Sequence, residues 1–172
     1  QQQILPVLTP LTLDPSRPFP QILNKSLNFI VGLKGRDIYG RQRHRALVQA
    51  PRSLPRLIQL PADLEGCGDE DYVFLSSIIH HFVEDLFPGL TINGCYQFRI
   101  TRNGDLYVDD EEVEDLVRAL QGELAASRYG AAVRLEVAEE CSEELSTFLL
   151  DHFQLTDRDL YRVAGPVNLN RL

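Results

Sequence analysis

Hydrophobic and polar positions alternate along several short stretches of the chain, and this period of two predicts β-strands. We expect six strands, over residues 26–34, 44–50, 72–75, 92–102, 131–137 and 160–163, with a short extended stretch at 56–60. The first two strands are expected to form a hairpin, because Gly35, Asp37 and Gly40 mark a turn between them.

A period of three to four residues predicts three helices. The first is expected over residues 76–87, with Ser76 as its N-cap and Pro88-Gly89 after its end. The second is expected over 109–125. The third follows Ser142, a second N-cap candidate, and carries Leu145, Phe148, Leu149 and Phe153. The strands and helices together predict one α+β domain whose sheet is mixed or antiparallel.

Residues 1–23 contain five prolines, which exclude a continuous helix and favour an extended arm. We therefore divide the chain into this Pro-rich arm, 1–23, and a folded domain, 24–172. The arm is apolar enough to lie against another surface. Its candidates for contact with another domain or with a second copy of the chain are Leu5, Leu8, Leu11 and Phe19.

Composition agrees with a single globular domain. The chain has 172 residues, of which 44% are hydrophobic and 24% charged, so a disordered chain and a small disulfide scaffold are poor interpretations. The longest apolar-rich run without a formal charge covers 72–83, well short of the roughly 20 residues that a membrane span needs. We expect no membrane span.

The charge is divided unevenly along the chain. Residues 1–62 contain nine Lys or Arg and two Asp, whereas residues 63–172 contain eight Arg and twenty-three Asp or Glu. The overall charge of −8 argues against a nucleic-acid partner. We expect the basic first third of the chain to contact either a partner domain or a local anion.

Cysteine usage and the first residue bear on the setting of the chain. Three Cys without a CxxC pair, and no secretory signal at the start, lead us to expect a cytoplasmic protein with reduced thiols. The chain begins with Gln and has no Met, so we expect a piece of a longer protein. An independent protein–protein adaptor is disfavoured on the same ground.

No catalytic motif is found. On a helix, His80/Glu84 and His81/Asp85 have i,i+4 spacing, but adjacent His side chains diverge by about 100°, so we expect a solvated face and no metal site. His152 stands alone in its region. There is no G-x-S-x-G, P-loop or G-x-G-x-x-G motif. We predict no catalytic residue and no bound cofactor.

Two pairs of arginines are candidates for anion binding. Arg43 and Arg45 share one face of the returning hairpin strand. We expect one of two roles for them: binding a phosphate or carboxylate, or forming a charged strand edge that opposes aggregation. Arg102 shares a strand face with Phe98 and Ile100, and Arg99 lies on the other face. A cation on an apolar face needs a partner, which is either a structural salt bridge or an anionic ligand.

Seven separated motifs, in order, resemble one family. They are LPVLTPL (5–11), DP with PFP (14–20), LPR with LP (54–61), LFP (86–88), FRITRNGDL (98–106), AVRLEV (132–137) and GPVNL (165–169). They resemble the middle, or head, domain of bacterial polyphosphate kinase of the long-chain-synthesising type, over essentially the whole chain.

The resemblance implies a noncatalytic scaffold and dimerisation domain within a larger enzyme. That enzyme uses ATP and Mg²⁺ and reversibly transfers the terminal phosphate of ATP to polyphosphate through a phosphohistidine. The family's phosphorylated histidine lies in its C-terminal domains, and no His here matches that motif. The resemblance implies other domains of the same polypeptide and a second copy as partners. Because the fold is grouped with phosphohistidine phosphatases, an alternative is a phosphate- or polyphosphate-binding domain acting through Arg99 and Arg102.

Overall fold

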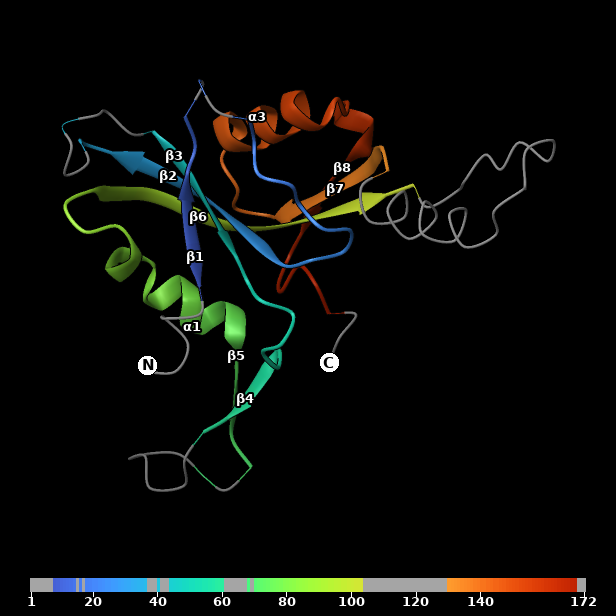
Figure 1. Cartoon of the computed structure of the whole chain (residues 1–172). Helices are drawn as coiled ribbons and strands as arrows, with labels where there is room; N and C mark the ends of the chain where they lie inside the picture. Colours follow the sequence, from blue (N-terminus) through green and yellow to red (C-terminus); the bar gives the residue numbers. More distant parts are fainter. Residues whose placement is uncertain are drawn as a thin grey trace, which may run out of the picture.

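A six-stranded mixed sheet forms the centre of the molecule (Figure 1). The computed structural model describes residues 8–14, 16, 18–36, 40, 44–60, 68, 70–103 and 130–169. The strand order is β1-β3-β2-β6-β7-β8, and every neighbouring pair is antiparallel except β7 and β8. The bounds are β1 Thr9–Thr12, β2 Asn28–Lys34, β3 Arg45–Gln49, β6 Thr91–Arg102, β7 Ala132–Ala138 and β8 Leu160–Val163. The predicted hairpin is the β2–β3 pair.

One helix covers each face of the sheet (Figure 1). α1 (Leu75–His81) packs on one face and α3 (Glu143–Phe153) on the other, so the described residues contain two α-helices. The third predicted helix, 109–125, lies outside the described residues. Neither described helix has the length or the apolar run needed to cross a bilayer. The α+β class is confirmed, with a mixed sheet.

β2 is buried on both faces. Phe29 and Val31 belong to the hydrophobic cluster on the α1 side, which includes Ile79 of α1. Ile30 belongs to the cluster on the α3 side, which includes Leu149 of α3. The sequence predicted one apolar face for this strand; the second is buried because a helix covers each side of the sheet.

Part of the expected arm belongs to the sheet. β1 pairs with β3 at the sheet edge, and the Leu13 N–H donates to the Arg45 carbonyl at 2.9 Å. In this register the backbone groups of Leu11 and Leu13 point toward β3, and the backbone nitrogen of Pro10 points toward the open edge. Because proline lacks an N–H, its position removes one donor from that edge, which opposes pairing with another chain.

The first helix departs from its prediction at both ends. Its N-cap position is Phe74, with no side-chain hydrogen bond, and Ser76 is buried inside the first turn. The predicted Ser76 cap is therefore wrong. Leu75 begins the helix because its N–H donates to the Arg56 carbonyl at 2.8 Å, so a tertiary bond replaces the cap.

The predicted end at Phe87 is also wrong, because α1 stops at His81. A separate 3₁₀ helix, η2 (Val83–Leu86), follows it and places Val83 and Phe87 in the core.

α3 follows its prediction closely. The Ser142 hydroxyl accepts a hydrogen bond from the Leu145 N–H at 3.4 Å, and two glutamates occupy the first turn. Gln154, at φ 57°, ends the helix in the left-handed conformation. A 3₁₀ turn, η3 (Asp157–Asp159), then leads into β8.

A two-stranded ribbon extends away from the main sheet (Figure 1). Its strands are β4 (Leu57–Gln59), within the predicted extended stretch, and β5 (Tyr72–Phe74). The ribbon connects β3 to α1. The segment that joins β3 to this ribbon, residues 50–56, forms part of the site described next.

Candidate functional site

Arg99 is held by a carboxylate within the sheet. It lies opposite Glu136 on β7, and its Nε is 2.5 Å from Glu136 Oε2. The same carboxylate pairs with Arg134 at 3.1 Å, and the Arg134 guanidinium lies 4.0 Å above the Tyr161 ring. The Glu136 side chain is 10% exposed. Arg99 is therefore part of a structural salt bridge.

Arg102 is held by backbone carbonyls. Its Nε donates to the Ile22 carbonyl at 3.1 Å and its Nη1 to the Gly130 carbonyl at 2.8 Å. Partial burial lowers the pKa of Arg102, but a guanidinium remains charged at neutral pH. Arg102 lies on the α3 side of the sheet and Arg99 on the α1 side. The structure therefore does not bring these two candidates together.

Arg45 also lies on the α3 side. Its Nη2 is 2.8 Å from Glu144 Oε1, and its guanidinium stacks 4.5 Å from the Phe148 ring centre. Glu144 is 71% exposed, so this pair resembles ordinary surface ion pairs, which contribute little to stability. Arg43 lies outside the described residues.

The predicted contact residues of the arm have partners within the chain. Leu8 is buried in the α1-side cluster, and Leu11 and Phe19 pack against the α3-side cluster. The Phe19 ring stacks on His152 with 3.6 Å between ring centres. Leu5 lies outside the described residues. Whether any of these residues also contacts a second molecule stays a prediction.

A cavity of about 460 Å³ lies between the arm and α3. Phe19, Phe148 and His152 form its aromatic side, and Arg45 and Asp14 add charges of opposite sign. Burial, and secondarily the Arg102 charge, lower the pKa of His152, which favours the neutral ring. The mixed charges give this cavity no clear preference for an anion.

No metal-binding group is assembled by the described residues: three or more His, Cys, Asp or Glu do not converge anywhere among them. Cys95 and Cys141 are free and buried. Burial raises the pKa of Cys95 to about 12 and that of Cys141 to about 11, so both thiols are poor nucleophiles at neutral pH. Cys67 lies outside the described residues.

Three cavities lie along the segment 49–56. Each shares a lining arginine with the next. The first, of about 170 Å³, is lined by Thr9, Leu23, Ser26, Asn28, Gln49, Ala50, Pro51 and Arg52. The second, of about 280 Å³, is lined by residues 52–56. Arg52 is shared by these two, which we call the Arg52 site. Arg56 is shared by the second cavity and a third, smaller one.

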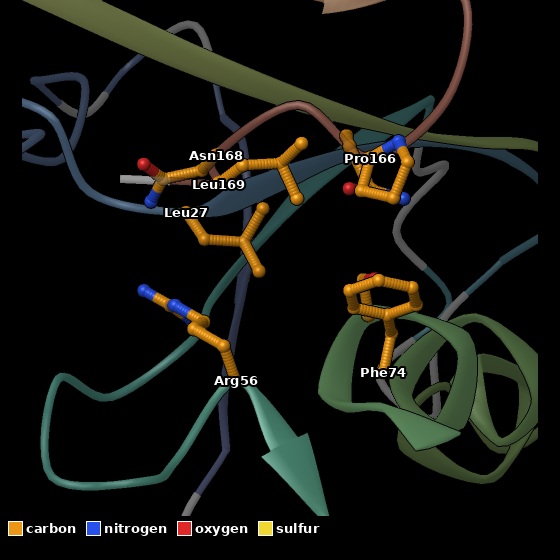
Figure 2. Close-up of a pocket in the computed structure, with 8 residues that line it drawn as sticks. Leu27, Arg56, Phe74, Pro166, Asn168 and Leu169 are labelled. Atoms are coloured by element: carbon orange, nitrogen blue, oxygen red, sulfur yellow. The ribbon is translucent and has the colours of Figure 1, made fainter. Parts of the chain in front are cut away.

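Figure 2 shows the third cavity, where Arg56 and Leu27 face Phe74 and Pro166 across a narrow space. Asn168 and Leu169 complete its upper wall. Arg56 is 6% exposed, so its charge is buried beneath the start of α1. The walls are mostly apolar, which makes this cavity less suited to an anion than the Arg52 site.

Local bonds fix the shape of the Arg52 site. Arg52 follows Pro51 in a turn that is closed by the Leu54 N–H donating to the Pro51 carbonyl at 3.3 Å. The Arg52 Nη2 donates to the Asn24 carbonyl at 2.6 Å. In the first cavity, the Asn28 Nδ2 donates to the Ser26 carbonyl and hydroxyl at 3.0 and 3.1 Å.

The charge at this site has one sign. Among the described residues, no Asp or Glu lines either cavity of the Arg52 site. The described residues from 16 to 60 include six Lys or Arg and no acidic residue. The site therefore has the electrostatic character of an anion site.

Comparison with known proteins decides the family. The family model described as "Polyphosphate kinase middle domain" matches residues 1–172, the whole chain. The chain belongs to the polyphosphate kinase middle-domain family. It is 58% identical over 172 residues to the polyphosphate kinase of Pseudomonas aeruginosa, and 56% identical over 171 residues to that of Neisseria gonorrhoeae. These two matches cover 100% and 99% of this chain, respectively, and 25% of each relative.

The fold of this polyphosphate kinase middle domain is also found in a solved structure. The crystal structure of polyphosphate kinase from Porphyromonas gingivalis aligns with a TM-score of 0.71 at 24% identity, covering 98% of this chain and 22% of that one. At this identity the likeness shows the fold alone. The chain spans about a quarter of the length of the curated relatives it matches.

The Arg52 site of this middle domain was not predicted from the sequence. Its walls come from β1, from residues 23–28 and from residues 49–56, which only the folded sheet brings together. One sequence signal was available: two Arg between prolines, in a part of the chain that is poor in acids.

Proposed function

We propose that this chain serves as a noncatalytic scaffold and dimerisation domain of a longer polyphosphate kinase. One observation carries the proposal: the family model of the polyphosphate kinase middle domain matches the whole chain. The parent enzyme uses ATP and Mg²⁺, moves the terminal phosphoryl group of ATP to a histidine with release of ADP, and then to the end of a polyphosphate chain. That histidine lies outside this chain, and the enzyme works in the cytoplasm.

The inactivity of the isolated chain is directly testable. We expect no ADP release and no polyphosphate when the chain is incubated with ATP and Mg²⁺. Turnover by the chain alone would contradict a noncatalytic role.

Dimerisation is tested by sedimentation velocity. The compared chains are the whole chain and a version lacking residues 1–7, which includes Leu5 but leaves β1 and Leu8 in place. We expect the whole chain to form dimers at raised concentration and the truncated chain to remain monomeric. Monomers of the whole chain at every concentration would exclude dimerisation by this domain alone. Dimers of both would move the interface away from residues 1–7.

Binding of phosphate or polyphosphate is the second candidate function. Arg99 and Arg102, the residues first proposed for it, already have Glu136 and carbonyl partners. The observation that favours binding is the Arg52 site, whose lining contains no Asp or Glu among the described residues. Titration with polyphosphate tests it: we expect binding at low ionic strength that weakens as salt is added. Absence of binding at low salt would remove this function.

A further inference from the structure

We propose that Arg52 is the anchor of a binding site for a linear oligophosphate, which lies in the two cavities that share this residue. The proposal rests on the second candidate function and assigns it a place and a ligand class. It moves the site from Arg99 and Arg102 to a residue that the sequence pattern did not single out.

One hydrogen bond orients the guanidinium of Arg52 and leaves its other N–H donors available for a ligand. Arg52 is exposed, and among the described residues its hydrogen bond goes to the Asn24 carbonyl through Nη2. A guanidinium has five N–H donors, so most of the fork remains available. Because one bond already holds the side chain, binding an anion costs less conformational entropy than it would for a free surface arginine.

The carbonyl that orients Arg52 is itself fixed. The next residue, Lys25, has φ 53°, and its N–H donates to the Ile100 carbonyl at 2.8 Å, which ties this turn to β6. On the other side, the Ser26 hydroxyl donates to the Leu23 carbonyl at 2.7 Å. The turn over residues 23–26 is therefore held at both ends, and Arg52 is anchored to the body of the domain.

Among the described residues, no carboxylate competes for Arg52. Arg99 pairs with Glu136 and Arg45 with Glu144, whereas the described residues that line the Arg52 site include no acid. A phosphate oxygen at Arg52 would thus meet a bidentate donor without displacing an internal ion pair. This difference separates Arg52 from Arg45, Arg99 and Arg134.

The dimensions favour a chain of phosphates over a single one. Cavities of about 170 and 280 Å³ share Arg52 as a lining residue, and the first has a polar wall with Thr9 and Gln49. A lone phosphate would fill part of one cavity. A linear oligophosphate can place one group at Arg52 and extend into both cavities, so affinity should increase with chain length.

The test is calorimetric titration of the whole chain with inorganic tripolyphosphate at low ionic strength. We expect Arg52→Ala to weaken binding at least about 10-fold, the loss typical of a hydrogen-bonded charged group. Arg52→Lys should retain part of the affinity, because it keeps the charge but loses the planar fork. Arg158→Ala is the matched control, since it removes the same charge from an exposed position on η3.

The outcomes separate the inference from the function on which it rests. If the unmodified chain does not bind tripolyphosphate, the binding function itself fails. If it binds and Arg52→Ala binds equally well, the function stands and its placement at Arg52 is overturned. Equal losses in Arg52→Ala and Arg158→Ala would indicate nonspecific charge attraction and also overturn the site. Equal affinity for orthophosphate and tripolyphosphate would overturn the extended-chain ligand.

Discussion

At the scale of single residues, Glu136 has the largest expected effect on stability. Its carboxylate is nearly buried and holds both Arg99 and Arg134. Glu136→Gln leaves two arginines without their counter-charge, and we expect a loss of roughly 3 kcal/mol in the free energy of unfolding. Urea denaturation measures it. Glu144→Gln, which breaks the exposed pair with Arg45, should cost less than about 1 kcal/mol. Equal losses in the two variants would contradict this assignment.

His152 should make stability depend on pH. Its pKa is lowered by burial and then by Arg102, so the unfolded chain binds a proton more readily than the folded one. The stabilising contribution is complete above the ordinary His pKa of about 6.5 and is lost as pH falls from there through the folded-state pKa. His152→Phe keeps an aromatic ring beside Phe19 and removes the titration. Thermal melts at pH 7.5 and 5.5 should therefore shift less in the variant; an equal shift would exclude His152 as the cause.

At the scale of elements, the two serines that resembled helix caps should behave differently. Ser142 accepts the Leu145 N–H, whereas Ser76 lies within the first turn of α1 and does not cap it. We expect Ser142→Ala to lower the free energy of unfolding by about 1 kcal/mol and Ser76→Ala to have a smaller effect. Chemical denaturation of both variants checks this. A larger loss in Ser76→Ala would mean that its buried hydroxyl has a structural role of its own.

The elements also show what local pattern could predict. Alternating apolar residues predicted the β2–β3 hairpin and β6–β8, because strand faces follow a period of two. The start of α1 could not be predicted, since the Leu75 N–H bonds to Arg56, nineteen residues earlier in the chain. Arg102 was recognised as needing a partner, but the carbonyls of Ile22 and Gly130 that accept its hydrogen bonds lie 80 and 28 residues away in the chain, so only the fold brings them to it. The Arg52 site was missed for the same reason, because three separate segments form it.

At the scale of the whole molecule, β2 joins two hydrophobic cores. Phe29 and Val31 pack toward α1, and Ile30 packs toward α3, so neither core is complete without this strand. A central element shared in this way should make the domain unfold as one cooperative unit. The opposite expectation, two cores that open separately, would apply if each had its own strands.

Ile30→Ala distinguishes these two cases. The side chain is fully buried on the α3 side, and its truncation should cost about 2–5 kcal/mol. Because β2 is common to both cores, we expect the slowest-exchanging amides of α1, such as Ile79, to lose as much protection from hydrogen exchange as those of α3, such as Leu149. Loss confined to α3 would show that the α1 side is stable by itself. Leu150→Ala, which truncates a buried side chain of α3 and leaves β2 unchanged, provides the comparison for an effect that begins in the helix.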